Sequence, residues 1–134
     1  MRREARESVY KLLFEYSFNK TLNEKTEELL CNSANLTDAD VEYIGKTIRG
    51  IIEKYDELTE TVMSVVKGYS TVERLDKAVY VALLYGSYEL KYAPEVPKGV
   101  AISEAINLSK EFGGDATVNF VNGALASINK KFNG

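Results

Sequence analysis

Apolar residues recur along this chain at the three- and four-residue spacing of amphipathic helices. The spacing is clearest where Val41, Ile44, Ile48 and Ile51 follow one another. No segment alternates apolar and polar residues with the sustained two-residue period of a half-buried strand. The pattern therefore predicts an all-α fold.

Caps and breaks in the sequence divide this helical pattern into about six to seven helices. Thr37 is a suitable N-cap, because Asp40 follows at the third helical position and Leu36 and Val41 can form a hydrophobic staple. We expect the first two helices at about 3–18 and 24–31, a third after Thr37, and a fourth that is capped by Asp56 and ends at Gly68. A fifth helix is expected at about 71–92, before a break at 93–97. Two helices follow the break: the first stops at Gly113 and Gly114, and the second is capped by Asp115 or Thr117.

An uncharged run covers residues 78–88. A membrane-spanning helix needs about 20 apolar residues, so this shorter run predicts a helix buried at the centre of the fold. The chain starts with charged residues and shows no apolar signal-peptide core. We therefore expect no membrane contact and a cytoplasmic location.

Composition bounds the chemistry. At 134 residues the chain fits one domain, residues 1–134. It contains no histidine, which removes the commonest general base and metal ligand, and its lone cysteine, Cys31, has no such base to activate it. We predict no catalytic residue, no metal site and no cofactor, and a protein that acts by binding.

The N-terminal segment is the first candidate binding site. The formal net charge is −3, yet residues 1–11 carry four cations against two acids. Arg2, Arg3 and Arg6 suit phosphate at a helix start, and Tyr10, about one turn after Arg6, could stack on an unpaired base. A helix start whose arginines are merely solvated would show the same cluster. The residues alone therefore indicate no more than a helical binding module, for an anion or RNA.

Longer motifs then resemble a known family. Residues 96–113 read VPKGVAISEAINLSKEFG and residues 120–125 read FVNGAL. These two stretches are similar to the C-terminal signature of the NusB family of bacterial transcription antitermination factors. The arginine-rich start at 3–7 and the segments 69–75 and 86–90 resemble further family blocks, so the resemblance covers essentially the whole chain.

The resemblance implies a fold of two small helical bundles packed as a single NusB-like domain. It also implies a non-catalytic factor that binds boxA-type single-stranded RNA together with NusE, a small-subunit ribosomal protein. The pair would join RNA polymerase antitermination complexes and act on ribosomal RNA operons. NusB-like proteins can self-associate, so we expect a monomer or a weak homodimer.

Matching positions imply two sets of site residues. The RNA side would comprise Arg2, Arg3, Arg6, Lys98, Asn119 and Asn122, with Tyr10 added from the residue argument above. Asn119 stands where the family usually has lysine, which removes one cation. The partner side would comprise Asp76, Val79 and Tyr80 on or beside the central helix.

Two alternatives remain from the sequence. The first is an accessory domain like the NusB-like part of ribosomal RNA methyltransferases, although a chain that ends at residue 134 leaves no room for a cofactor-binding α/β domain. The second is a protein-interaction module or homodimer without an RNA role. RNA binding and sedimentation would separate these alternatives from the antitermination factor.

Overall fold

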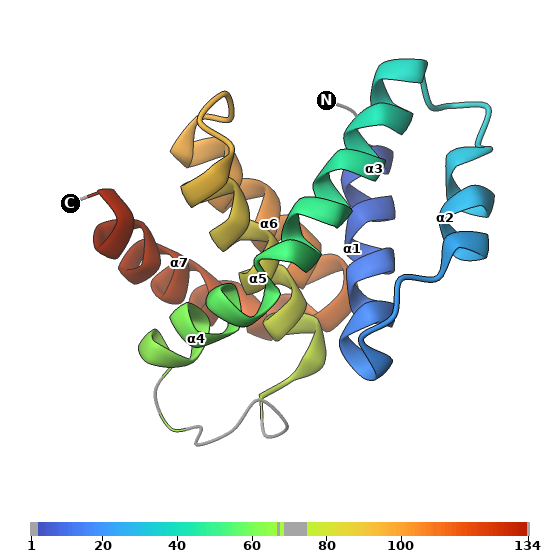
Figure 1. The fold of residues 1–134 in the computed structure, drawn as a ribbon. Coiled ribbons are helices and arrows are strands. Elements are labelled where there is room, and N and C mark those ends of the chain that lie inside the picture. The colour runs from blue at the N-terminus through green and yellow to red at the C-terminus, as the bar shows by residue number, and fades with distance from the viewer. Residues whose placement is uncertain (1–2, 67, 69–74, 134) are drawn as a thin grey trace. The chain divides into compact units, whose positions relative to one another are not determined.

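The computed structural model describes residues 3–66, 68 and 75–133, and this described part is built from helices without strands (Figure 1). The all-α prediction is therefore confirmed. The elements are α1 (Arg3–Asn19), α2 (Glu24–Cys31), α3 (Asp38–Glu53), α4 (Tyr55–Val65), α5 (Lys77–Tyr92), α6 (Lys98–Gly113), the short 3₁₀ helix η2 (Asp115–Thr117) and α7 (Val118–Asn133).

These elements form two compact units, Met1–Glu53 and Lys54–Gly134. The two small helical bundles that we expected correspond to these units. That the whole chain acts as one domain stays a prediction. None of the helices in the described ranges is long and apolar enough to cross a membrane.

In the first unit, α3 packs against α1, and α2 contacts both. The core of α1 and α3 is apolar on the faces that the sequence pattern predicts, and includes Val9, Leu12, Leu13, Ile44, Ile48 and Ile51. In contrast, α2 has no buried residue. A bidentate ion pair holds it instead, with Arg49 of α3 donating to both carboxylate oxygens of Glu27 at 2.8 and 2.9 Å.

The start of α3 confirms the predicted cap. The backbone N–H of Asp40 donates to the Thr37 hydroxyl at 3.1 Å, and the backbone N–H of Thr37 donates to the Asp40 carboxylate at 3.0 Å. This reciprocal arrangement satisfies two donors at the helix start.

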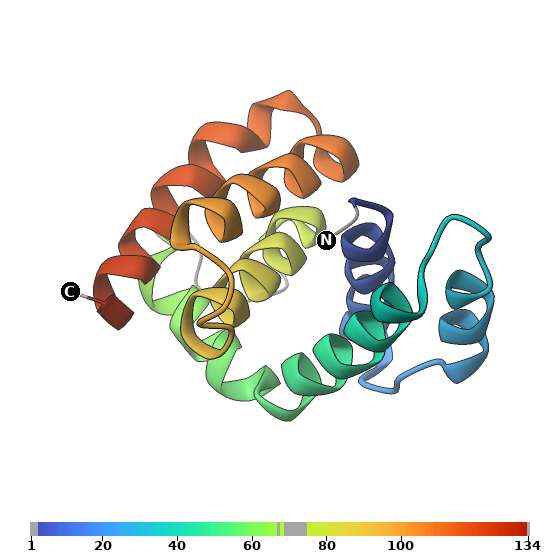
Figure 2. The same cartoon turned by 90° about the horizontal axis from the view of Figure 1, so that it is seen from above.

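In the second unit, α5 contacts α4, α6 and α7 (Figure 2). Twelve of its sixteen residues are buried, which confirms the predicted central helix. The helices α6 and α7 lie side by side and run in opposite directions. The turn between them uses Gly114 with φ of 95°, a conformation that favours glycine.

Three predicted boundaries in this unit are wrong. The α4 helix begins at Tyr55 after an N-cap at Lys54, so Asp56 lies within the first turn and is not the cap. It ends at Val65, before Gly68. The α5 helix begins at Lys77 with Asp76 as its N-cap; of the earlier predicted stretch, 71–74 lies outside the described residues and Leu75 is not helical.

Candidate nucleic-acid interface

The first turn of α1 carries Arg3, which has 59% of its side chain exposed. Its Nε lies 3.7 Å from the carboxylate of Glu7, one turn later. An exposed pair of this kind contributes little to stability, so the guanidinium can be recruited by a phosphate at small cost. Arg2 was predicted beside it and lies outside the described residues.

The next two predicted residues on α1 face inward. Arg6 is only 4% exposed and Tyr10 only 1% exposed. The Tyr10 ring stacks on Phe14, with centroids 6.2 Å apart. Because stacking on a base requires an accessible ring face, this arrangement gives Tyr10 a role in packing α1.

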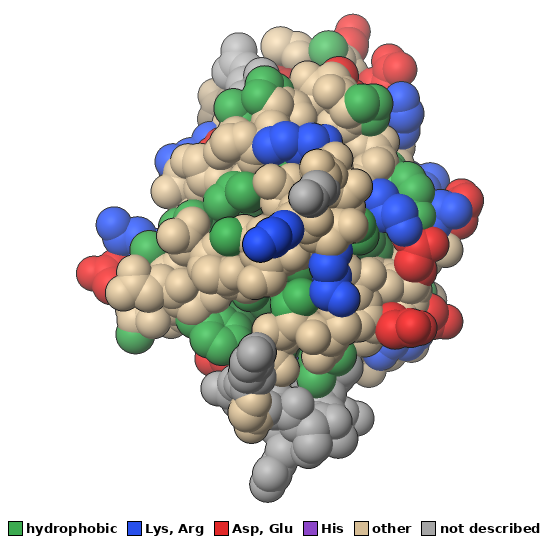
Figure 3. Space-filling view, turned by 90° about the vertical axis from the view of Figure 1, so that its left-hand side faces the viewer, with side chains coloured by type: hydrophobic (Ala, Val, Ile, Leu, Met, Phe, Trp, Pro, Cys, Tyr) green, Lys and Arg blue, Asp and Glu red, His purple; other side chains and the backbone are tan. Residues whose placement is uncertain are grey.

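Two asparagines stand at the start of α7. Asn119 and Asn122 are exposed and are one turn apart, so their amides share a face of the helix. The sixteen residues of α7 include no Asp or Glu. A helix without acidic side chains does not repel a phosphate backbone. Figure 3 looks from the side toward which α7 ends, where single basic side chains lie among backbone and uncharged polar side chains and acidic side chains lie nearer the edges.

Lys98 is not near these asparagines. It opens α6, whereas Asn119 and Asn122 lie in the first turns of the antiparallel α7, so the two positions are at opposite ends of the helix pair. The Lys98 ammonium donates to the backbone carbonyl of Leu90 at 3.0 Å. It thereby satisfies one of the last carbonyls of α5, which have no partner within their own helix.

The three predicted partner residues separate into one exposed and two buried side chains. Asp76 is exposed, and its Oδ1 accepts from the backbone N–H groups of Ala78 at 2.8 Å and Val79 at 3.3 Å. Val79 and Tyr80 are buried. The Tyr80 hydroxyl shares a hydrogen bond of 2.7 Å with Thr59 and donates to the Tyr55 hydroxyl at 3.0 Å.

A cluster that joins α4 to α5 was not found from the sequence. Glu57 accepts from Lys91 at 2.9 Å and from the Tyr92 hydroxyl. The Tyr92 hydrogen bond, and after it Lys91, lowers the pKa of Glu57, and the same carboxylate raises the pKa of Lys91. The partners are more than thirty residues apart, so no local spacing reveals the cluster.

The groups that often carry catalysis or bind metals are sparse. Partial burial, and then the Glu27 carboxylate, raise the pKa of the Cys31 thiol, which disfavours the nucleophilic thiolate. Among the residues with described placement, no group of three or more His, Cys, Asp or Glu could hold a metal ion.

Comparison with known proteins places this geometry in a family. The model of the NusB family matches residues 3–130. A transcription antitermination protein NusB of Clostridium botulinum is 32% identical over 95% of this chain and 98% of its own length. One of Ruminiclostridium cellulolyticum is 32% identical over 96% of this chain and 88% of its own length.

Solved structures agree with this assignment. T. maritima NusB superposes with a TM-score of 0.83 at 27% identity, over 98% of this chain and 92% of that one. A structure of the antitermination factors NusB and NusE in complex with double-stranded RNA matches with a TM-score of 0.83 at 20% identity, over 98% of this chain and 97% of that one, and shows a shared fold. On the family model and the relatives together, the chain belongs to the NusB family.

Proposed function

We propose that this chain is a transcription antitermination factor that binds boxA-type single-stranded RNA together with NusE. The observation that carries the proposal is the match to transcription antitermination proteins over 95% of the chain. The fold shared with a NusB–NusE complex that contains RNA supports the same pair of partners.

On the RNA side, we propose that the exposed residues make the contacts. Arg3, with Arg2 beside it in sequence, would bind phosphate, and the Asn119 and Asn122 amides would hydrogen-bond base edges or phosphates. Arg6 and Tyr10 would act indirectly by fixing α1, since both are buried. Lys98 would support the fold through the Leu90 carbonyl.

On the partner side, we propose that NusE contacts Asp76. Its Oδ1 caps α5, while Oδ2 makes no hydrogen bond within the described part of the chain and can accept from a partner cation. Val79 and Tyr80 would shape that surface from below, because their side chains are buried.

Dependence on two partners follows from the charge of the molecule. A chain with net charge −3 and only five arginines offers a weak site for RNA. NusE docked beside it would extend the surface and raise the effective affinity. We further propose that the assembly joins RNA polymerase in the cytoplasm on ribosomal RNA operons, and that the chain works as one domain, without catalysis, as a monomer or weak homodimer.

The proposal is tested by the binding of a labelled boxA-type RNA, with and without the NusE of the same organism, at fixed moderate salt. We expect the parent chain to bind the RNA weakly alone and more tightly with NusE. With NusE present, Arg3→Ala and Asn122→Ala should each clearly lose RNA affinity. The control is Lys46→Ala, which removes an exposed cation of α3. Absence of RNA binding in every condition would contradict the proposal and favour a protein-interaction module.

The partner side is tested by two substitutions at Asp76. An asparagine keeps a side-chain oxygen for the α5 cap but removes the charge, whereas lysine reverses the charge and loses the cap. We expect both to weaken NusE binding in a titration, with stability nearly unchanged in Asp76→Asn. Unchanged NusE affinity in Asp76→Asn and Asp76→Lys would place the partner elsewhere.

A further inference from the structure

The helix α1 leaves only one narrow face open to solvent. Eight of its seventeen residues are buried, and up to its last turn Arg3, Lys11 and Phe18 are the exposed ones. At the helical period these three side chains fall within about 80° of one another, with the half-buried Phe14 between them. We call these four residues the open strip of α1. The strip extends over about 22 Å from Arg3 to Phe18.

The Phe18 ring at the end of the open strip is accessible. With 65% of its surface exposed, Phe18 is the most exposed aromatic side chain among the described residues. The Phe14 ring contacts it, with the ring centroids 5.3 Å apart and the planes at 63°. This contact orients the Phe18 ring while most of the side chain remains open. An accessible ring of this kind is what the stacking of an unpaired base requires.

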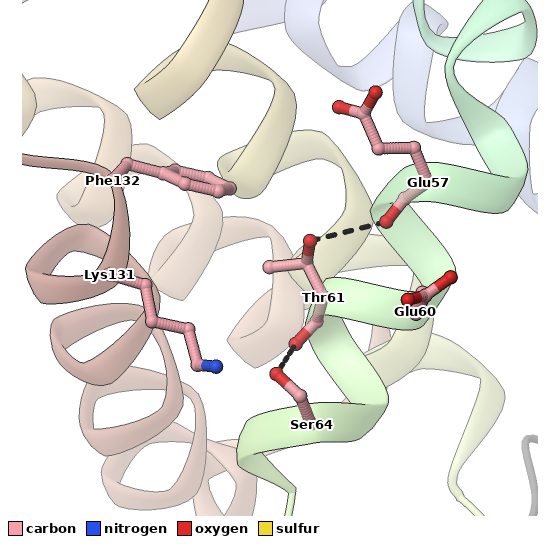
Figure 4. A pocket seen from close by; sticks show the side chains of 6 residues that line it. All are labelled: Glu57, Glu60, Thr61, Ser64, Lys131 and Phe132. Carbon is pink, nitrogen blue, oxygen red and sulfur yellow. Dashed lines mark hydrogen bonds between the residues drawn. The ribbon is translucent and has the colours of Figure 1, made fainter.

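The aromatic ring beside the cavity of the second unit lacks such access. That cavity, of about 490 Å³, lies between α4 and α7 and is lined in part by Glu60, Lys131 and Phe132 (Figure 4). Lys91 Nζ lies 5.2 Å from the centroid of the Phe132 ring, and Glu60 projects from the opposite side of α4. The cavity therefore offers no open ring with polar groups around it, and Phe18 is the better candidate for stacking.

The second half of the open strip carries no opposing negative charge of its own helix. Residues 11–20 contain two lysines and a single acid, Glu15. Glu15 Oε2 accepts from the Asn23 amide and the Thr26 hydroxyl, both at 3.4 Å, and Oε1 is buried. The carboxylate is thus turned toward the start of α2. From Lys11 onward, the strip consequently presents a cation and then two rings.

We propose that single-stranded RNA continues along the open strip beyond Arg3, with a phosphate at Lys11 and a base stacked on Phe18. The inference rests on the proposed function, because it extends the RNA side from the first turn of α1 to its last. Cations that follow the backbone and aromatic rings that stack on bases are the usual means of binding a single strand. Since every base has a π-face, this stacking would add affinity with little sequence preference.

The surroundings of Phe18 favour RNA over a protein partner. A stable protein interface buries about 800 Å² on each partner around an apolar centre. Phe18 is instead followed by the exposed polar residues Asn19, Lys20 and Thr21, so the apolar area is little larger than the ring itself. One ring and one nearby cation match one base and one phosphate.

The first experiment measures binding of a labelled boxA-type RNA in the presence of NusE. We expect Phe18→Ala to weaken RNA binding about tenfold or more, Phe18→Tyr to bind like the parent chain, and Phe18→Leu to bind like Phe18→Ala. The matched control is Leu29→Ala, which removes a side chain of the same unit that is 75% exposed and should leave RNA affinity unchanged. Thermal unfolding of each variant verifies that the exposed substitutions leave the fold intact.

Salt dependence separates the two contacts. Lys11→Ala should make the slope of log affinity against log salt shallower by about 0.7, because it removes one phosphate contact. Phe18→Ala should lower the affinity at every salt concentration with the slope unchanged, since stacking releases no counterion. Lys46→Ala, which removes an exposed lysine of α3, serves as the control for Lys11→Ala.

Fluorescence reports the stacking directly. The chain contains no tryptophan, so Phe18→Trp and Leu29→Trp each introduce a single reporter. Boxa-type RNA with NusE should quench the tryptophan of the Phe18→Trp chain, because a stacked base lies in contact with the indole, and should leave that of the Leu29→Trp chain unchanged.

The outcomes distinguish this inference from the proposed function. RNA binding that is lost in Arg3→Ala but unchanged in Phe18→Ala, without quenching in Phe18→Trp, would defeat the inference and leave the antitermination function intact. Weaker NusE binding by Phe18→Ala in the absence of RNA, or full RNA affinity in Phe18→Leu, would also overturn it, since either result indicates an apolar protein contact. Absence of RNA binding by the parent chain with NusE would overturn both.

Discussion

At position 86 the packing leaves no room for a side chain. A Cβ on Gly86 would lie 2.9 Å from Cδ2 of Leu125 and 3.1 Å from Cβ of Ala105, which brings three helices into close contact. We expect Gly86→Ala to lower the free energy of unfolding by about 1–3 kcal/mol, because an overpacked core must shift. Urea denaturation measures the change.

Gly123 provides the control. It lies within α7, and a Cβ there would meet nothing within 4 Å. Gly123→Ala should stabilise the chain by roughly 0.5–1 kcal/mol through the helix propensity of alanine. Equal destabilisation by both substitutions would show that close packing is not what position 86 requires.

Single residues also show what local sequence can reveal. The Thr37–Asp40 cap was predictable because both partners lie within one turn. The burial of Arg6 was not, because it flanks the apolar arc of α1 and only tertiary packing decides how much of that flank is covered. The exposed part of the predicted RNA site was correspondingly overestimated.

Among the elements, α2 is held by polar contacts. It buries no residue, and the bidentate Arg49–Glu27 pair links it to α3. We expect its amides to exchange with solvent far faster than those of α5, and faster still in Arg49→Ala, with little change in global stability. Hydrogen exchange followed by mass spectrometry gives both rates; equal protection of α2 and α5 would contradict this.

The Glu57 cluster makes the contact between α4 and α5 sensitive to pH. Because folding lowers the pKa of Glu57, its contribution is present above the unfolded pKa and is lost as the pH falls through the folded value. We expect Glu57→Gln to be less stable than the parent near about pH 7 and to approach it near about pH 3. Urea denaturation at both pH values measures this, with Asp56→Asn as the control; a constant difference would exclude the cluster as its cause.

The predicted helix boundaries are wrong where contacts between residues distant in sequence decide them. Tyr55 begins α4 one residue before the expected cap, and its ring packs edge-on against Tyr80, 6.3 Å away between centroids. The family resemblance implies that Lys98 lies on the RNA side, and the structure adds a hydrogen bond from its ammonium to a carbonyl eight residues earlier. Neither arrangement has a signature in local spacing.

For the whole molecule, the number of cations that contact RNA phosphates sets how steeply RNA binding depends on salt. Each phosphate contact with single-stranded RNA contributes a slope of about −0.7 in log affinity against log salt. We expect Arg3→Ala to make the slope shallower by about that amount, whereas Lys46→Ala leaves it unchanged. A titration at several salt concentrations gives both slopes, and an unchanged slope in Arg3→Ala would remove Arg3 from the interface.

The division into units follows the order of the chain. The first unit consists of the first 53 residues, and its helices α1, α2 and α3 contact one another. During synthesis at roughly 5–20 residues per second, this segment leaves the ribosome seconds before the second unit is complete. The N-terminal helices can therefore begin to pack while translation of the same molecule is still in progress.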